Sequence, residues 1–239
     1  MAKIGIIGCG WLGKPLAKVL DIKHQVECFS RKTQEDNDLS YVLNPPSEDT
    51  FWEQDIFIFS ISTRDNYLQT LHDLISNCSQ SASIILMSST SVYKEHDALV
   101  DEKTIIKEKS LQKQAEELVL SLRDSVLILR LGGLMGDDRI SGKWKSTSAF
   151  TDGPVNYIHK DDVIAIVIKM IDKNIVNGIY NLVSPEHPFR SLVHTKNSKD
   201  FSFDLGSFEG KTQRIVSSDK LLKTLDYTFL HPDPLEFWT

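Results

Sequence analysis

The chain has 239 residues, with 27 Lys and Arg against 33 Asp and Glu, so its formal net charge is −6 and its isoelectric point lies near 5.6. This acidic balance supplies no basic field and argues against a nucleic-acid partner. No apolar stretch approaches the roughly twenty residues that cross a bilayer, and the first expected strand starts at Lys3, so we expect a cytoplasmic chain with no membrane partner and no targeting peptide.

A glycine-rich turn follows the first expected strand. The run from Lys3 to Ile7 is short, apolar and β-branched, as in a parallel strand buried on both faces, and it leads into Gly8-Cys9-Gly10-Trp11-Leu12-Gly13. Such a turn bends tightly at its first glycine, exposes backbone to a pyrophosphate at the second, and packs a helix closely at the third. A plain connecting turn is the alternative. We predict that the pyrophosphate of a dinucleotide is held by Gly8, Gly10, Trp11, Leu12 and Gly13.

The end of the second expected strand indicates which dinucleotide binds. Residues 25–29 are apolar enough for a strand and close a βαβ-like unit of about thirty residues. A carboxylate at this strand end normally accepts hydrogen bonds from the ribose 2′-hydroxyl, whereas an arginine accommodates a 2′-phosphate. The chain has Ser30, Arg31 and Lys32 here. We therefore predict NADP rather than NAD, with a solvated Arg-Lys pair as the alternative.

Strands and helices then alternate along the chain. Strands are expected at 55–60, 83–87, 126–129 and 178–183, and helices at 65–77, 103–122 and 160–171. This alternation predicts an α/β fold, a Rossmann-type doubly wound parallel sheet with right-handed crossovers. Residues 1–135, completed by 156–183, are expected to form the dinucleotide-binding core. A mobile loop at 136–155 would cover the site, and 184–239 would form a small C-terminal substrate lobe.

The cysteines and two acidic residues have expected structural roles. Cys9, Cys28 and Cys78 are odd in number and follow no disulfide or metal-ligand spacing, so we expect reduced, buried thiols and no metal site. Asp161 or Asp162 is expected to cap the helix that begins near Lys160, since Asp is a preferred cap residue. A catalytic role is the alternative for these two aspartates.

Several segments resemble one family when taken in order. They are Ser88–Tyr93, Val100–Glu102, Arg130–Gly136, Ile158–Val163, Gly178–Leu182 and the tail segments Gly210-Lys211, Asp219–Leu222, Leu225–Tyr227 and His231-Pro232. Together they resemble the extended short-chain dehydrogenases/reductases, the group of NAD(P)-dependent epimerases and dehydratases. The resemblance implies that Ser89 occupies the place of the catalytic Ser or Thr. It also implies a homodimer through the helices expected at Asp65–Asn77 and Lys103–Leu122.

The chain departs from this family at two points. Its turn is Gly-x-Gly-x-x-Gly, not the family's Gly-x-x-Gly-x-x-Gly, and its Tyr-x-x-x-Lys pair is missing, since no tyrosine lies between Asp101 and Asp124. In the family, the lysine lowers the tyrosine pKa so that the phenol exchanges a proton during hydride transfer. The chain therefore resembles atypical members that lack this tyrosine. Lys113, and after it Tyr93, would be the substitute.

Each substitute has a structural alternative. Lys113 belongs to a charged set that would form a solvated helix face through i,i+3 and i,i+4 pairs. That set comprises Lys107, Glu108, Lys109, Lys113, Glu116 and Glu117. Further candidate proton donors are Tyr93, His96, Tyr157 and His159, for which packing or a surface hydrogen bond is the alternative.

Three functions are consistent with these patterns. The first is an NADP(H)-dependent oxidoreductase or epimerase/dehydratase acting on a sugar-like or small carbonyl or alcohol substrate. Its catalytic residues would be Ser89, Thr90, Lys113 and Tyr93, with Ser88 beside the nicotinamide and Ser60, Ile61 and Ser62 near the ribose. The second is a cofactor-binding sensor or partner-binding protein without turnover. The third is a hydroxyacid-type dehydrogenase. It is disfavoured because such chains end in an all-helical domain, whereas this chain has an expected strand at 178–183 and a tail that contains Pro and Phe.

Overall fold

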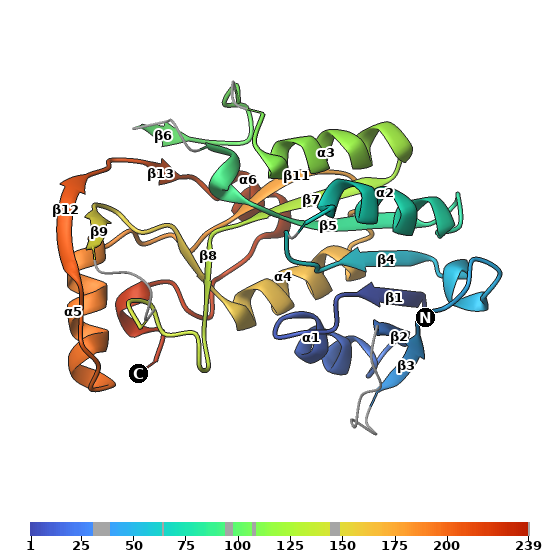
Figure 1. Ribbon diagram of the computed structural model, residues 1–239, viewed down its shortest axis with the longest axis horizontal. Helices are drawn as coiled ribbons and strands as arrows, with labels where there is room; N and C mark the ends of the chain where they lie inside the picture. Colours follow the sequence, from blue (N-terminus) through green and yellow to red (C-terminus); the bar gives the residue numbers. More distant parts are fainter. Residues whose placement is uncertain (31–38, 64, 94–97, 107–108, 144–148, 239) are drawn as a thin grey trace. The chain divides into compact units, whose positions relative to one another are not determined.

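The computed structural model of the chain describes residues 1–30, 39–63, 65–93, 98–106, 109–143 and 149–238 (Figure 1). Its centre is a seven-stranded sheet with the order β11-β7-β5-β4-β1-β2-β3. The strands are β1 (Lys3–Ile7), β2 (Gln25–Ser30), β3 (Ser40–Leu43), β4 (Ile56–Phe59), β5 (Ser83–Ser89), β7 (Val126–Leu131) and β11 (Gly178–Leu182). β1 pairs in parallel with both β2 and β4, and β2/β3 and β4/β5 are parallel as well. The predicted α/β, doubly wound class is confirmed.

The strand order reverses next to β1. From β1 the chain runs outward through β2 and β3, and then returns to the other side of β1 to form β4 and β5. In open sheets of this kind, ligands bind outside the carboxyl ends of the strands at the point where the order reverses. The glycine-rich turn follows the carboxyl end of β1, so it lies at this switch point.

Helices cover the sheet on both faces. They are α1 (Gly13–Leu20), α2 (Tyr67–Asn77), α3 (Leu111–Leu122) and α4 (Lys160–Asp172), with a short 3-10 turn, η1 (Thr50–Glu53). α2 and α3 lie together on one face and α1 lies on the other (Figure 1). The core on the α2 and α3 side contains aromatic residues from η1 and β4. This core is made of fully buried side chains such as Phe51, Phe57, Phe59, Leu71 and Ile75.

The helix expected from Lys103 begins later, at Leu111. Ser110 is the N-cap residue, and its hydroxyl accepts a hydrogen bond from the Lys113 N–H over 3.2 Å. Thr104 and Asp101 instead hydrogen-bond to each other in a turn. A Ser hydroxyl at this position satisfies an N–H that has no partner within the helix, and this sets the start of α3. The homodimer through α2 and α3 stays a prediction.

The chain divides into two compact units. Unit 1 comprises Met1–Val92, Lys107–Leu129 and Val167–Ile179, and unit 2 comprises Tyr93–Ile106, Arg130–Ile166 and Tyr180–Thr239. Elements not yet named are β6 (Leu99–Val100), β8 (Gly133–Met135), β9 (Ala149–Asp152), β10 (Tyr157–His159), α5 (Arg190–Asp200), β12 (Ser207–Lys211), β13 (Ile215–Val216), α6 (Asp219–Leu225), η2 (Thr90–Tyr93) and η3 (Pro234–Glu236). Unit 2 is therefore larger than the lobe expected at 184–239.

Unit 2 contains three short parallel strand pairs, β10/β8, β12/β9 and β13/β6. The pair β12/β9 includes part of the segment 136–155, which was expected to be a loop. Residues 149–152 of that segment form β9, in which Phe150 lies opposite Phe208 of β12. The loop prediction is therefore wrong for this part, because a late segment of the chain supplies a strand partner.

No helix within the part of the chain that the structure describes is both long and apolar enough to cross a membrane.

Candidate functional site

The glycine turn after β1 has two closed positions and one open position. A Cβ atom on Gly8, whose φ is +105°, would lie 2.4 Å from the carbonyl oxygen of Ser60. A Cβ atom on Gly13 would lie 2.2 Å from the carbonyl oxygen of Gly8. A Cβ atom on Gly10 would meet nothing within 4 Å. Gly8 and Gly13 are thus required for packing, whereas Gly10 leaves bare backbone in open space.

Helix α1 begins directly after this turn, at Gly13. The Gly10 N–H donates to the Gly8 carbonyl over 2.8 Å, and the Lys14 N–H donates to the Gly10 carbonyl over 2.9 Å. Leu12 stands at the N-cap of α1, and its side chain has no atom that accepts a hydrogen bond. Unsatisfied N–H groups and the positive end of the helix dipole form a site for an anion. This backbone fits a pyrophosphate, and Trp11 and Leu12 belong to the same turn.

The predicted ribose segment lies beside the glycine turn. β4 ends at Phe59, and the Ser60 N–H donates to the Ile7 carbonyl over 2.8 Å. The same Ser60 supplies the carbonyl oxygen that closes the space beside Gly8. Ile61 packs partly into the core, and Ser62 is exposed. The structure therefore brings the predicted pyrophosphate and ribose segments together at the carboxyl ends of neighbouring strands.

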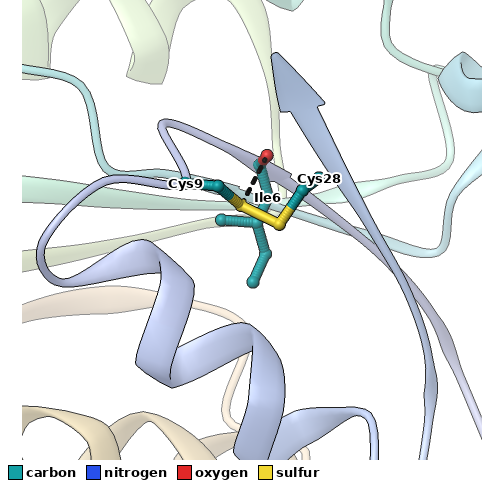
Figure 2. Close-up of a disulfide and its surroundings, with 3 residues drawn as sticks. All are labelled: Ile6, Cys9 and Cys28. Carbon is teal, nitrogen blue, oxygen red and sulfur yellow. Dashed lines mark hydrogen bonds between the residues drawn. A yellow bond between two sulfur atoms is a disulfide. The ribbon is translucent and has the colours of Figure 1, made fainter. Parts of the chain in front are cut away.

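The prediction of reduced thiols is wrong for two of the three cysteines. Cys9, in the glycine turn, and Cys28, in β2, form a disulfide with a Cα–Cα distance of 5.9 Å (Figure 2). The parallel pairing of β1 with β2 places Cys28 opposite Ile6, three residues before Cys9. Sequence spacing gave no hint of the pair because strand pairing, not proximity in the chain, brings the sulfurs together. Cys78 is a free, buried thiol, as expected, and burial raises its pKa to about 12.

Ser30 is the one residue of the predicted adenosine-binding segment that lies within the described part of the chain. Ser30 is the last residue of β2 and lies opposite Leu43 of β3. Arg31 and Lys32 lie outside the described residues. Their proposed contact with a 2′-phosphate therefore rests on their position directly after β2.

A buried carboxylate lies below the end of β5. The Ser88 hydroxyl donates to Glu116 Oε1 over 2.6 Å, and Glu116 is fully buried on α3. The alternative that placed Glu116 on a solvated face is wrong, because Glu116 lies between Ala115 and Val119 on the packed side of the helix. Glu116 is the residue at this site that sequence reasoning missed. Its position three residues before the buried Val119 was the available signal.

Ser89 follows at the carboxyl end of β5. Its hydroxyl oxygen accepts a hydrogen bond from the Ser91 N–H over 3.1 Å, and its side chain is partly buried. Because that bond uses an oxygen lone pair, the Ser89 proton can be donated to a substrate oxygen. Thr90, the next residue, is 5% exposed. Of the two hydroxyls, only that of Ser89 belongs to a half-buried side chain.

Lys113 forms a surface pair on its own helix. Its Nζ lies 3.3 Å from Glu117 Oε1, one turn further along α3, and the Glu117 side chain is 55% exposed. This i,i+4 pair favours the solvated-face alternative for these two residues. His96, another candidate, lies outside the described residues.

Tyr93 lies in the interior of unit 2. Its ring is 0% exposed, and its hydroxyl accepts a hydrogen bond from Arg130 over 2.6 Å and donates to Asn181 Oδ1 over 3.0 Å. Burial raises the pKa of Tyr93, and the neighbouring Arg130 charge only partly offsets this. Both hydrogen-bonding directions of the phenol are used within the protein. The geometry therefore favours the packing alternative for Tyr93.

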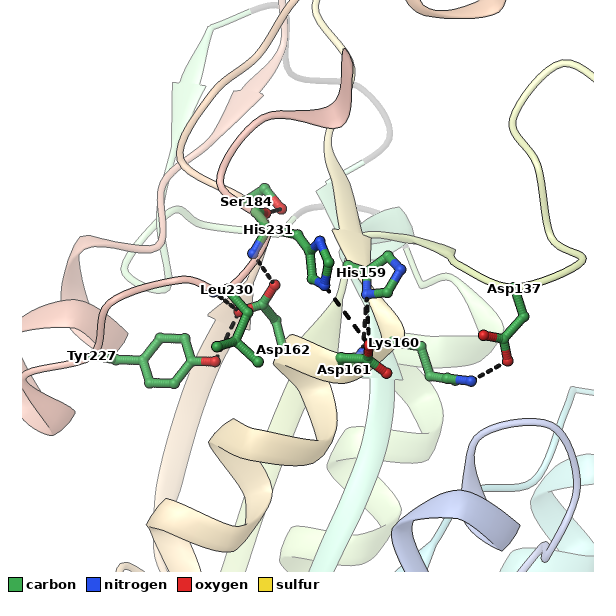
Figure 3. Close-up of polar contacts among 9 residues, drawn as sticks. All are labelled: Asp137, His159, Lys160, Asp161, Asp162, Ser184, Tyr227, Leu230 and His231. Carbon is green, nitrogen blue, oxygen red and sulfur yellow. Dashed lines mark hydrogen bonds and ion pairs between the residues drawn. The ribbon is translucent and has the colours of Figure 1, made fainter. Parts of the chain in front are cut away.

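A polar cluster surrounds the start of α4 in unit 2 (Figure 3). The Asp162 carboxylate is fully buried and accepts hydrogen bonds from the Tyr227 hydroxyl over 2.8 Å and from the N–H groups of Leu230, over 2.7 Å, and His231, over 3.0 Å. The Ser184 hydroxyl donates to the His231 carbonyl over 3.2 Å. The expectation that Asp162 caps α4 is wrong, because its carboxylate accepts hydrogen bonds from Tyr227, Leu230 and His231 instead. Asp162 holds the segment 227–231 against the first turn of α4.

Asp161 lies next to two imidazoles. Its Oδ2 is 3.6 Å from His159 Nδ1 and 3.7 Å from His231 Nε2, and the two rings are 3.8 Å apart between centroids. Burial, and then the nearby His231, lower the pKa of His159. His159 Nδ1 already accepts the Asp161 N–H over 3.2 Å, and the positive end of α4 disfavours a cation. One hydrogen bond and two longer carboxylate–imidazole contacts therefore hold Asp161, His159 and His231 together at the start of α4.

Tyr157 is the remaining candidate proton donor. Its hydroxyl lies 2.8 Å from His194 Nε2, the two rings are stacked, and the Phe150 ring lies nearly perpendicular to that of His194. Burial raises the Tyr157 pKa, and it lowers the His194 pKa to about 4. This buried pair also favours packing over proton transfer.

The sequence is similar over nearly its whole length to Protein YeeZ of Escherichia coli strain K12. The two are 28% identical, with 98% of each chain covered. No protein-family model matches the chain.

Several solved structures share the fold of the chain over nearly its whole length. A conserved protein of unknown function from Silicibacter pomeroyi DSS has a TM-score of 0.81 at 17% identity, covering 99% of this chain and 96% of its own. UDP-glucuronic acid 4-epimerase from Bacillus cereus, in complex with NAD, has a TM-score of 0.76 at 16% identity, covering 98% of this chain and 96% of its own. A short-chain dehydrogenase/reductase superfamily protein from Agrobacterium tumefaciens with bound NAD has a TM-score of 0.75 at 14% identity, covering 98% of this chain and 95% of its own.

The fold is that of the short-chain dehydrogenases/reductases and their epimerase relatives. This likeness agrees with the sequence segments that resemble the extended group. The subgroup that lacks the active-site tyrosine stays a prediction.

Proposed function

We propose that the chain binds NADP(H) at the glycine turn and acts on a sugar-like or small carbonyl or alcohol substrate. The observation that carries this proposal is the open backbone at Gly10, flanked by the closely packed Gly8 and Gly13. The N-terminus of α1 supports it, because the Leu12 side chain at the N-cap accepts no hydrogen bond from the backbone, which leaves the positive end of the helix dipole open to an anion. The solved structures that contain NAD have the same fold.

The preference for NADP rests on the residues after β2. A cation at this position accommodates the 2′-phosphate, whereas NAD enzymes place a carboxylate there. Arg31 is the first residue after the strand, and Lys32 follows it. Loss of one charged hydrogen bond costs about 1.5–3 kcal/mol, so Arg31→Ala is expected to weaken NADPH binding at least about tenfold.

Calorimetric titration with NADPH and NADH tests this assignment. NADPH is expected to bind the unmodified protein more tightly than NADH, and Arg31→Ala should remove most of that difference while leaving NADH binding unchanged. The unchanged NADH affinity is the matched control for folding. Equal affinities for the two cofactors in the unmodified protein would contradict the NADP assignment.

A bound nicotinamide supplies hydride transfer, and the chain must then orient the substrate and move a proton. Ser89 is the residue proposed to donate a hydrogen bond to the reacting oxygen, because its hydroxyl lies at the carboxyl end of β5. A serine alone is a weak acid near neutral pH, so Lys113, although it pairs with Glu117 in the structure, is the residue proposed to assist it. Ser89→Ala is expected to abolish turnover, and Lys113→Met to reduce it at least about tenfold. NADPH oxidation untouched by both substitutions would contradict these roles.

The second candidate function is cofactor binding without turnover. The buried Tyr93, whose hydroxyl is engaged by Arg130 and Asn181, favours it. The missing tyrosine between Asp101 and Asp124 favours it as well. Under this alternative, NADPH binds with the same preference over NADH, and no carbonyl substrate is reduced. Single-turnover absorbance at the nicotinamide band separates the two functions.

A further inference from the structure

The disulfide joins two parts of the candidate dinucleotide site. Cys9 stands between Gly8 and Gly10 in the glycine turn, and its sulfur is bonded to that of Cys28 (Figure 2). Cys28 lies two residues before Ser30, at which β2 ends. One bond therefore connects the turn proposed for the pyrophosphate to the strand that leads to the proposed adenosine end.

The two cysteine residues differ in their exposure to solvent. Cys28 is 0% exposed, whereas Cys9 is partly exposed. An external thiolate would therefore attack Cys9, the more exposed of the two residues, with Cys28 as the leaving group. The reduced form has a place in the same fold, because Cys9 Sγ lies 3.7 Å from the Ile6 carbonyl oxygen, to which its thiol can donate.

We propose that Cys9 and Cys28 form a reversible thiol–disulfide site that controls the affinity of the glycine turn for its dinucleotide. This inference rests on the function proposed above. Disulfides in reducing compartments are mostly transient or redox-sensing, and the sequence predicts a cytoplasmic chain. A disulfide beside the phosphate turn is then a site of regulation.

The exchange partner is a dithiol reductant. One of its thiolates attacks Cys9 Sγ, the Cys9–Cys28 bond breaks, and Cys28 leaves as a thiolate that takes a proton. The second thiolate of the reductant then attacks the mixed disulfide and releases Cys9. Two electrons pass from the dithiol, which becomes a disulfide, to the protein, which becomes a dithiol. A low-molecular-weight disulfide reverses the steps.

The oxidised turn is the better-ordered form. Gly8 and Gly13 fix the turn through contacts with Ser60 and with each other, and the disulfide adds an anchor between them at Cys9. Reduction removes that anchor and leaves the Gly8–Gly10 backbone more freedom. A ligand that binds the mobile turn must order it, which lowers affinity. Oxidation is therefore expected to tighten dinucleotide binding about fivefold, at the low end of usual coupling between sites.

Calorimetry with NADPH on three forms of the full chain tests the proposal. These are the oxidised protein, the protein reduced with dithiothreitol, and the double variant Cys9→Ala/Cys28→Ala. The dissociation constant should rise about fivefold on reduction, and the double variant should match the reduced form and not respond to dithiothreitol. Cys78→Ala, which changes a thiol outside the disulfide, should respond as the unmodified protein does.

Alkylation gives a readout that needs no cofactor. After dithiothreitol treatment of the folded protein, N-ethylmaleimide should label Cys9 and Cys28 on denaturation, and without reductant it should label neither. Labelling of both without reductant would overturn the proposal, as would a dissociation constant that reduction leaves unchanged. Absence of NADPH binding in every form would instead overturn the proposed function, on which the switch depends.

Discussion

Ser88 at the end of β5 donates a 2.6 Å hydrogen bond to Glu116, a fully buried carboxylate on α3. The bond joins the strand that carries Ser89 to a helix on the face covered by α2 and α3. A buried carboxylate requires such donors, since taking a charged group out of water without partners costs several kcal/mol.

Ser88→Ala removes this donor from a buried acceptor and should lower the free energy of unfolding by about 1–3 kcal/mol. Glu116→Gln keeps an oxygen that accepts from Ser88 and should cost less than Glu116→Ala, which loses the interaction and leaves a cavity. Urea unfolding of the three variants measures the differences. Stability unchanged in Ser88→Ala would show that the bond contributes nothing.

Reduction of the disulfide should destabilise the protein as well as alter ligand binding. The bond closes a loop between residues separated by 19 positions. Closing a loop of about this length restricts the unfolded chain and contributes about 3 kcal/mol. Urea midpoints with and without dithiothreitol measure the effect, and Cys9→Ala/Cys28→Ala should show no dependence on the reductant. A midpoint equally sensitive to dithiothreitol in the double variant would contradict the assignment.

Asp162 should be essential to the stability of unit 2, and Tyr227 should contribute one part of its effect. Asp162→Ala leaves three donors without their buried acceptor, whereas Tyr227→Phe removes one donor of the three. We expect a loss of about 1–3 kcal/mol for Tyr227→Phe and a larger loss for Asp162→Ala. Thermal unfolding compares the two. Equal losses would show that the backbone bonds to Leu230 and His231 are not stabilising.

His194 should make the protein sensitive to mild acid. Burial, and then the Arg190 charge, lower its pKa from 6.5 to about 4, so the unfolded chain binds a proton that the folded chain does not. Stability from this group is complete above pH about 6.5 and is lost as the pH falls toward about 4, by up to about 3 kcal/mol.

His194→Gln keeps an amide that can hydrogen-bond to Tyr157 but does not titrate. Its unfolding free energy should therefore fall less than that of the unmodified protein between pH 7 and pH 4. Parallel pH profiles for the two proteins would contradict the assignment of the acid sensitivity to His194.

The sequence predicted those parts of the fold that depend on local pattern. The apolar run of β1, the spacing of Gly8, Gly10 and Gly13, and the alternation of strands with helices each act within one element or its neighbour. The structure places the first two glycines where a side chain would be excluded or free, as the motif requires. Local regularity of this kind is readable because the backbone itself imposes it.

Contacts between distant segments were not readable in the same way. Cys9 meets Cys28 only through the β1/β2 register, and Ser88 meets Glu116 only through the packing of α3. Asp162 was expected to cap its own helix, but it binds a segment more than sixty residues later. Residue type predicts that these groups need partners, whereas tertiary packing decides which partners they find.

The most direct test is the affinity of Gly10→Ala for NADPH, measured by calorimetry beside the unmodified protein. A Cβ atom at Gly10 meets nothing within 4 Å, so the melting temperature should not change. The same Cβ atom occupies the space in which the pyrophosphate approaches the backbone. NADPH should bind the unmodified protein, and the variant should bind it at least about tenfold more weakly, a difference of about 1.4 kcal/mol. Equal binding by the two proteins, or no NADPH binding by either, would contradict the account.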